Sequence, residues 1–305
     1  MLSISTSFNV KSRLDVRTML EELKSFGLEY IEIGYHFKPD KLEEIISLLK
    51  PLGLKVSSVH NFCPCPDEPP TGRHISNYFR MSALDESERD KAVVWTKRAV
   101  DTAVRVGAKF VVIHAGMVEI DELPYNILSK MFEEGKSGTD EFLEIRRQYL
   151  QLRKEKSPPH VAAVQKSLEE VLTYALSQHV SIGLETRFYP NEIPNFEEVG
   201  YFLKLFATKG LVYWHDTGHA QAQNALGLIP HEAYFKHYRN FLAGMHIHDC
   251  RGVEDHLAPF TADINFDKIF ASILSDICRV VEAHPPATME QIKAAVARLR
   301  SMKES

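Results

Sequence analysis

The strongest constraint on the fold is an alternation of short apolar segments with longer amphipathic segments, repeated eight times along the 305-residue chain. The short segments are β-branched or apolar and too short for helices, whereas the longer ones are rich in Lys and Glu at helical spacing. A repeated strand–helix unit is typical of a parallel sheet. Because eight such units close a barrel, we predict an α/β fold of the (β/α)8 TIM-barrel class.

The element boundaries follow from the same pattern. The expected strands are 2–5, 30–34, 55–60, 109–114, 180–185, 211–216, 244–248 and 279–282. The expected helices lie near 15–26, 40–51, 86–106, 160–178, 195–208, 231–242, 266–276 and 287–302. Glycines follow four of the helical segments, where a residue that tolerates positive φ ends a helix: Gly27, Gly53, Gly107 and Gly210.

One connection, after the fourth strand, is much longer than the usual βα loop of about 2–6 residues. We therefore expect a single domain, 1–305, with an insertion at about 117–159 that contains a helix over 139–156. Pro158-Pro159 predicts the start of the next helix, since proline is tolerated in a first helical turn. The end of the insertion is basic at Arg146, Arg147, Arg153 and Lys154. A solvated helix face is the favoured interpretation of these charges, and a lid or an anion-contacting arm is the alternative.

The composition indicates which classes of partner and which cellular location to expect. Thirty-six Lys and Arg against 41 Asp and Glu give a formal charge of −5, which provides no overall attraction for a polyanion, so a nucleic-acid partner is disfavoured. Four cysteines are too few for a secreted disulfide framework, so a cytoplasmic location is expected. No apolar stretch is long enough to predict a membrane span. The oligomeric state stays open, with a homo-oligomer among the possibilities.

Polar side chains that can ligate a metal or move a proton stand at the ends of the second to eighth strands. They are Glu32, His60, His114, Glu185, Asp216, His246 and Glu282. The carboxyl ends of barrel strands meet on one face, where barrels carry out their chemistry. Several carboxylates that converge there would repel one another without a cation. The set Glu185, Asp216, His246 and Glu282 offers mixed oxygen and nitrogen ligands for Mn²⁺, Mg²⁺, Co²⁺ or Zn²⁺, and composition does not select among these metals.

Two motifs add further groups to this face. The HDTGHA sequence at 215–220 places His219 three residues after Asp216, on the first turn beyond a strand. The MHIHDCR sequence at 245–251 places His246 and His248 on the same face of a strand, with Asp249 as a candidate orienting carboxylate. Glu254 and His256 follow in the next loop.

At these residues the sequence resembles the xylose isomerase-like TIM barrels, a superfamily of sugar isomerases, ketose epimerases and type-four apurinic/apyrimidinic endonucleases. The resemblance implies that Glu185, Asp216, His246 and Glu282 are the metal ligands and that His219 lies beside the substrate. The endonuclease branch binds three zinc ions. Its additional ligands would correspond to His60, His114, His219, Glu254 and His256, with Glu254 in place of an aspartate. The loop after His256 reads HLAPFTA, without the glycine-containing turn common among relatives.

The residues therefore predict a divalent-metal-dependent isomerase or epimerase acting on a sugar or a sugar-like hydroxy-carbonyl compound. Such a reaction moves a proton next to a carbonyl through a metal-stabilised enediolate. Glu185 and Glu282 are the candidate base and acid, and His219, His248 and Arg251 are candidate substrate-binding residues. The alternatives are a multinuclear zinc phosphodiesterase and a metal-binding barrel without catalysis.

Overall fold

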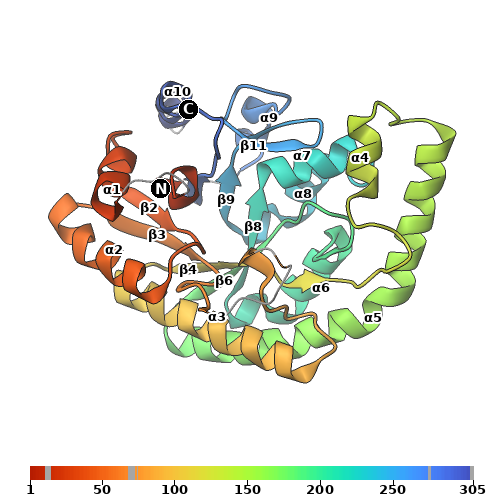
Figure 1. Cartoon of the computed structure of the whole chain (residues 1–305), viewed down its shortest axis with the longest axis horizontal. Coiled ribbons are helices and arrows are strands. Elements are labelled where there is room, and N and C mark those ends of the chain that lie inside the picture. Colours follow the sequence, from red (N-terminus) through yellow and green to blue (C-terminus); the bar gives the residue numbers. More distant parts are fainter. Residues whose placement is uncertain (11–14, 68–72, 74, 274–275, 303–305) are drawn as a thin grey trace.

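Eight parallel strands form a closed barrel in the order β1-β2-β3-β4-β6-β8-β9-β12, and β12 pairs back to β1 (Figure 1). The computed structural model describes residues 1–10, 15–67, 73, 75–273 and 276–302. The barrel strands are β1 (Leu2–Ser5), β2 (Tyr30–Ile33), β3 (Lys55–His60), β4 (Phe110–Ile113), β6 (Ser181–Glu185), β8 (Leu211–Asp216), β9 (Leu242–Ile247) and β12 (Cys278–Val281). This architecture confirms the predicted (β/α)8 fold, and the strand boundaries agree with the sequence pattern to within two residues.

Helices surround the barrel and return the chain to the start of each following strand (Figure 1). They are α1 (Val16–Lys24), α2 (Pro39–Leu52), α3 (Glu86–Val106), α4 (Ile127–Glu133), α5 (Asp140–Ser177), α6 (Phe196–Phe206), α7 (Thr217–Ala225), α8 (His231–Tyr238), α9 (Phe266–Phe270) and α10 (Met289–Ser301). The four glycines predicted to end helices all have positive φ. Helix α9 is shorter than the expected 266–276 segment, of which residues 274 and 275 lie outside the described residues.

The long helix α5 corrects one prediction. Pro158 and Pro159 lie inside it, so the expected insertion helix and the following barrel helix form one continuous element. Pro158 lacks the N–H that would bond to the carbonyl oxygen of Lys154, and the hydroxyl of Ser157 donates to that oxygen instead, at 3.3 Å. Figure 1 shows the yellow-green first part of α5 turning away from its green second part, as expected for prolines in a helix interior.

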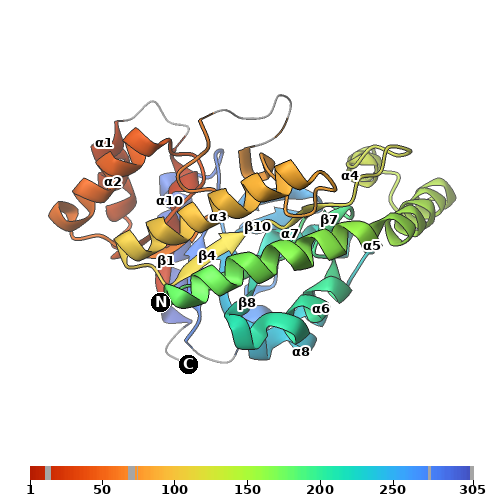
Figure 2. The ribbon, with the colours of Figure 1, turned by 90° about the horizontal axis from the view of Figure 1, so that it is seen from below.

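The second part of α5 packs beside α3 along the outside of the barrel, as Figure 2 shows. The first part projects past the barrel together with α4 and has a small apolar cluster of its own. This cluster consists of Leu128, Met131, Phe142, Leu226 and Val253, and it joins the insertion to the end of α7 and to the loop after β9. The insertion therefore lies against the end of the barrel where the strands finish.

Two short antiparallel strand pairs extend the same end of the barrel. Strand β5 (Gly116–Met117) pairs with β7 (Glu192–Ile193), and β10 (Asp249–Arg251) pairs with β11 (Glu254–Leu257). Strands β5 and β7 follow the barrel strands β4 and β6, and the β10–β11 hairpin follows β9, so both pairs lie around the mouth.

The barrel interior is filled by Trp214, which is fully buried. Gly183 and Gly244 lie against its indole; a Cβ at Gly244 would collide with the ring, and a Cβ at Gly183 would contact it tightly. Because alternate residues of a strand face opposite sides, Trp214 and Asp216 point into the barrel while Tyr213 and His215 pack against α8 on the outside. The indole thus forms a floor beneath the charged groups at the mouth. Within the residues described, no helix combines the length and the apolar character needed to cross a membrane.

Candidate metal centre

The four predicted ligands meet at the mouth of the barrel. One ligand atom each of Glu185, Asp216, His246 and Glu282 lies within 4.8 Å of all the others, and the four side chains are buried. Nδ1 of His246 lies 2.6 Å from Oε1 of Glu185, 3.0 Å from Oε2 of Glu282 and 3.8 Å from Oδ2 of Asp216. Each residue ends, or directly follows, a different parallel strand, which is why residues far apart in sequence converge.

The charges at this centre are concentrated and negative. Burial alone would raise the pKa of Glu185, but His114 and His246 outweigh it and hold the pKa well below its ordinary value. Burial would likewise raise the pKa of Glu282, which His246 lowers instead. For His246 burial favours a lower pKa, and Glu282, Glu32 and Glu185 raise it well above the ordinary value. Three ionised carboxylates and one imidazole at these distances match the hard and borderline ligands that divalent cations prefer.

Arg187 provides a fixed positive charge that the sequence analysis missed. Its NH1 atom donates to Oε2 of Glu185 at 2.8 Å, and its NH2 atom donates to Oε1 of Glu192 at 2.7 Å. Nε2 of His114 also lies 2.6 Å from Oε2 of Glu185. Glu185 therefore presents Oε1 to the other ligands while Oε2 is held from the opposite side.

The HDTGHA motif begins helix α7, and the structure gives a role to its Asp216, Thr217 and Gly218. The carboxylate of Asp216 caps the helix by accepting the backbone N–H of His219 at 2.7 Å. The hydroxyl of Thr217 donates to the carbonyl oxygen of His248 at 2.6 Å and so ties α7 to β9. Gly218 is needed because a Cβ there would collide with the imidazole of His248. The motif thus brings Asp216 and His248 together.

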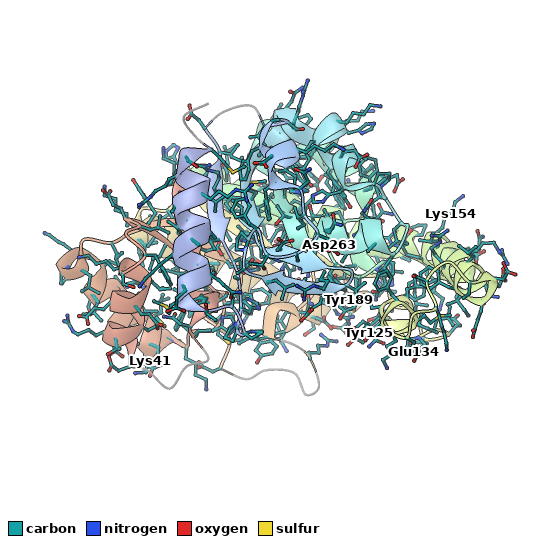
Figure 3. All side chains as sticks on the ribbon, turned by 90° about the horizontal axis from the view of Figure 1, so that it is seen from above. Lys41, Tyr125, Glu134, Lys154, Tyr189 and Asp263 are labelled. Carbon is teal, nitrogen blue, oxygen red and sulfur yellow. The ribbon has the colours of Figure 1, made fainter. Side chains whose placement is uncertain are left out.

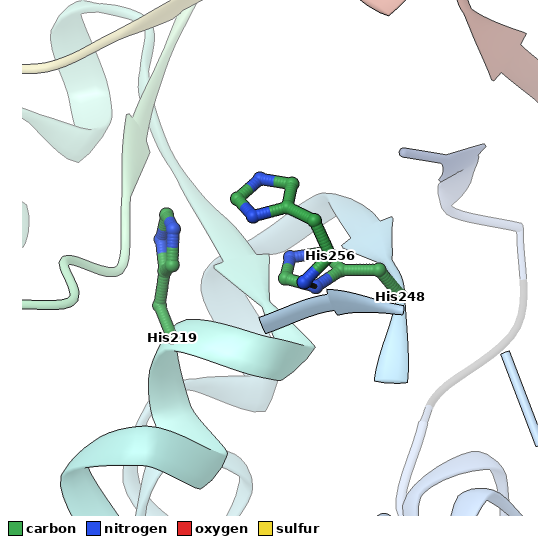
Figure 4. A group of neighbouring side chains, drawn as sticks. All are labelled: His219, His248 and His256. Carbon is green, nitrogen blue, oxygen red and sulfur yellow. Dashed lines mark hydrogen bonds between the residues drawn. The ribbon is translucent and has the colours of Figure 1, made fainter. Parts of the chain in front are cut away.

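Three histidines, drawn in Figure 4, lie next to one another beside Asp216: His219, His248 and His256. Nδ1 of His248 accepts the backbone N–H of His256 at 2.8 Å, so its Nε2 carries the proton and donates to Asp216 at 2.9 Å. Nδ1 of His219 donates to the carbonyl oxygen of Thr186 at 2.9 Å. The ring of His256 stacks on that of His248, with centroids 4.1 Å apart.

The remaining predicted residues divide into two groups. His60 and His114 form a second candidate cluster with Glu185, because one ligand atom of each lies within 4.8 Å of the others. Arg251 and Glu254 are exposed, form an ion pair with each other at 3.5 Å and do not line the central cavity.

Asp255, and not Glu254, lies beside the histidines where an additional ligand was predicted. Its Oδ2 atom lies 3.0 Å from Nδ1 of His256 and 3.6 Å from Nε2 of His219. Asp249 was expected to orient a histidine, and this is wrong: its carboxylate accepts backbone N–H groups of the 261–264 loop. The family resemblance implied Glu254 as an additional ligand, but in the structure the adjacent Asp255 contacts His256 and lines the cavity.

The ligands open into a cavity of about 660 Å³. Glu185, Glu282, His219 and Asp255 lie at its inner end, together with Tyr35, another residue that the strand pattern did not single out. Residues of the 117–159 insertion and of the 188–192 loop line the rest.

The family assignment agrees with this geometry. Residues 20–302 match the family model of the xylose isomerase-like TIM barrel. The chain belongs to the xylose isomerase-like TIM barrel family. The predicted resemblance is thereby confirmed, and no match was found among curated proteins.

Solved structures with similar folds include several sugar epimerases. A 3-keto-D-glucoside 4-epimerase, YcjR, from E. coli superimposes with a TM-score of 0.67 at 13% identity over 98% of each chain. A D-tagatose 3-epimerase-like protein gives 0.68 at 16% identity, covering 99% of this chain and 97% of its own. D-Psicose 3-epimerase from Clostridium cellulolyticum H10, crystallised with D-tagatose, gives 0.67 at 12% identity, covering 100% and 99%. At these identities the likeness shows the fold alone.

Proposed function

We propose that this member of the xylose isomerase-like family is a divalent-metal-dependent isomerase or epimerase of a sugar or a closely related hydroxy-carbonyl compound. The observation that carries the proposal is the convergence of Glu185, Asp216, His246 and Glu282 within 4.8 Å, with Glu185 and Glu282 lining an open cavity. Sugar epimerases among the structural neighbours support the substrate class. Mn²⁺, Mg²⁺, Co²⁺ and Zn²⁺ all suit this donor set.

A divalent cation held by these four side chains would act as a Lewis acid that makes the C–H next to a sugar carbonyl more acidic. We assign proton removal and return to Glu185 and Glu282, which both line the cavity and come from β6 and from the end of β12. Arg187 and His114 hold Oε2 of Glu185, so the orientation of this carboxylate is set before a substrate binds. Two carboxylates from different strands can serve opposite faces of one carbon.

His219 and His248 take different roles in this proposal. His219 lines the cavity, and we assign its Nε2, which lies 3.6 Å from Oδ2 of Asp255, to a hydrogen bond with a sugar hydroxyl. His248 is fully buried and does not line the cavity, so it positions Asp216 through its Nε2–H instead of touching the substrate. Arg251, on the exposed hairpin, has no place in the proposed site.

Deuterium exchange tests the proposal. Protein loaded with Mn²⁺ is incubated in D₂O with a panel of ketohexoses, and we expect deuterium on the carbon next to the carbonyl in at least one sugar, with exchange abolished by a chelator. Glu185→Gln and Glu282→Gln should each lower exchange by at least 10²-fold while the circular dichroism spectrum stays unchanged. The control Glu141→Gln lies on the exposed start of α5. Wild-type exchange rates in either site variant would contradict the assigned role.

A multinuclear zinc phosphodiesterase is the second candidate, and the geometry gives it one specific support. His60, His114 and Glu185 form one further potential ligand group, and His219, His248 and His256 form another. Metal analysis separates the two functions. One bound metal per chain, together with deuterium exchange into a sugar, favours the epimerase. Three bound zinc ions, together with cleavage of abasic DNA, favour the endonuclease. A protein that binds no divalent ion would favour a barrel without this chemistry. A cytoplasmic location stays a prediction; all four cysteines are buried and free.

A further inference from the structure

A second group of potential metal ligands shares Glu185 with the central four. One ligand atom each of His60, His114 and Glu185 lies within 4.8 Å of the other two. Nε2 of His114 and Nε2 of His60 lie 2.6 and 3.7 Å from Oε2 of Glu185. Nδ1 of His60 donates to the carbonyl oxygen of Asn61 at 3.1 Å, a contact of the kind that orients metal-ligating histidines. By donor type alone, two imidazoles and a carboxylate suit a second divalent ion, bridged to the first by Glu185.

The guanidinium of Arg187 contacts the same carboxylate oxygen that this second ion would need. Its NH1 atom donates to Oε2 of Glu185 at 2.8 Å. A metal–oxygen bond of about 2.1 Å would therefore place an ion bound to Oε2 no farther than about 5 Å from NH1. At that separation, repulsion between a divalent ion and a guanidinium weakens binding by at least about 10³-fold, even at an effective dielectric constant of about 20. Arginine is always charged in proteins, so the repulsion is permanent.

The contacts of Arg187 hold its side chain in one position. Arg187 is only 5% exposed, and its Nε and NH2 atoms donate to Oε1 of Glu192 at 3.2 and 2.7 Å. Oε2 of Glu192 accepts the backbone N–H groups of Phe188 and Tyr189, which fixes this carboxylate in turn. The ring of Tyr189 lies next to that of Tyr125 in the insertion, as Figure 3 shows, with centroids 4.8 Å apart. The loop that carries the guanidinium is therefore packed in place, and the guanidinium cannot simply swing aside.

The central ligands tolerate this guanidinium because they carry more negative charge. Asp216 and Glu282 join Glu185 there, and three carboxylates outweigh one divalent ion. Among the three members of the second group, only Glu185 is negative, and its charge is already shared with Arg187. Histidines bind a metal in their neutral form, so the two imidazoles add no negative charge. The repulsion from Arg187 is thus offset on one side of Glu185 and not on the other.

We propose that the guanidinium of Arg187 takes the place of a second divalent ion beside Glu185, so that the group of His60, His114 and Glu185 binds no metal. This inference rests on the proposed function, which puts one divalent ion at the four central ligands. A guanidinium orients a carboxylate, but it does not generate a hydroxide from bound water as a second metal ion does. Arg187 thereby favours proton transfer on a sugar over hydrolysis of a phosphodiester by paired metal ions.

Removing the guanidinium should open the second site, and metal counting tests this. Arg187→Leu/Glu192→Gln removes the buried pair as a unit, and the amide oxygen at position 192 can still accept the backbone N–H groups. Each protein is dialysed against Co²⁺, and the bound metal is measured by mass spectrometry. We expect one more Co²⁺ per chain in the double variant than in the wild type, and the addition of His60→Ala should abolish the extra ion. The control Arg147→Leu/Glu144→Gln removes an exposed pair of the same type and should keep the wild-type count.

Electron paramagnetic resonance of the Mn²⁺-loaded proteins shows where the extra ion binds. Two Mn²⁺ ions bridged by Glu185 are exchange-coupled, so the double variant should give the spectrum of a coupled pair and the wild type that of isolated ions. Equal metal counts in the two proteins, an extra ion without coupling, or a coupled pair in the wild type overturns the inference. If the double variant does not fold, the wild-type spectrum at saturating Mn²⁺ decides: isolated ions support the role of Arg187, and a coupled pair refutes it.

The proposed function and this inference can fail separately. If the wild type exchanges no deuterium into a sugar, or binds no divalent ion, the proposed function fails. The His60-dependent difference in Co²⁺ count between the double variant and the wild type then still decides the role of Arg187. An extra ion that depends on His60 supports it, and the absence of such an ion refutes it.

Discussion

Nε2 of His246 lies 3.1 Å from Oε2 of Glu32, while Nδ1 of the same ring faces Glu185 and Glu282. Glu32 is fully buried in β2, and Oε2 also accepts a hydrogen bond from the hydroxyl of Ser58 at 2.7 Å. A carboxylate on the far nitrogen of a metal-ligating histidine fixes the ring and its tautomer, and raises its basicity. Glu32, inside the barrel, thus orients the imidazole of His246 toward Glu185 and Glu282.

The first prediction concerns this carboxylate. In Glu32→Gln the side chain keeps its shape but loses the charge that favours a proton on Nε2, so Nδ1 becomes a weaker ligand. We expect the dissociation constant for Mn²⁺ to rise about 10- to 100-fold in calorimetric titrations. Glu44→Gln, on the exposed surface of α2, is the matched control. Wild-type Mn²⁺ affinity in Glu32→Gln would show that His246 does not depend on Glu32.

The second prediction concerns Arg153, whose burial contradicts the expected solvated face. Its guanidinium contacts both carboxylate oxygens of Glu198, at 2.8 and 2.7 Å, and donates to the carbonyl oxygens of Pro190 and Glu192. Arg153→Met leaves Glu198 buried without its charge partner, so the free energy of unfolding should fall by about 3–5 kcal/mol in urea titrations. Arg147→Met breaks only the exposed pair with Glu144 and should cost less than about 1 kcal/mol. Equal losses in the two variants would contradict the account.

The sequence predicts the candidate ligands from strand geometry together with the family resemblance. In a parallel barrel every strand ends on the same face, so a polar residue at the end of an apolar run must lie at the mouth. The rule predicts Glu185, Asp216, His246 and Glu282 at this face together with Glu32, His60 and His114, and the family resemblance selects the four from these seven. The family model then confirmed the fold that the rule requires.

The residues that were missed depend on loops and on tertiary packing. Arg187 and Asp255 lie beyond the barrel strands, Arg187 in the loop after β6 and Asp255 in the short strand β11, so the periodicity of the barrel strands does not predict which side chain faces inward. Pro158 is read locally as a helix start, yet packing of α5 against α3 and the Ser157 hydroxyl keep the helix continuous. Tertiary contacts there override a local preference.

The third prediction concerns Gly218, where α7 begins. A Cβ at this position collides with the imidazole of His248, so Gly218→Ala should push the ring away from Asp216. We expect a loss of about 1–3 kcal/mol in the free energy of unfolding, the usual cost of overpacking. The double variant Gly218→Ala/His248→Ala is the control. If the collision is the cause, Gly218→Ala costs much less when His248 is already Ala, whereas strictly additive losses in a double-mutant cycle would disprove it.

The last prediction is a pH dependence of the free energy of unfolding, and it arises from a histidine outside the barrel mouth. His231 packs against His215 with 3.0 Å between their Nε2 atoms, and its Nδ1 faces the side-chain oxygen of Gln221. Burial lowers the pKa of His231 from 6.5 to about 4, and Asp216 and Glu232 oppose this only in part. Between these two values the unfolded chain binds a proton that the folded chain does not, so stability falls as the pH falls from 6.5 to 4.

His231→Gln removes the group that binds this proton in the unfolded chain and keeps an acceptor for His215. The free energy of unfolding should therefore decline less steeply over this pH range than in the wild type. The difference between pH 7 and pH 4 should shrink by at most about 3 kcal/mol, measured by urea unfolding at each pH. His237→Gln, on the exposed side of the same helix α8, should leave the decline unchanged. The assignment is wrong if both variants decline with the wild-type slope, because then the proton taken up on unfolding belongs to other groups.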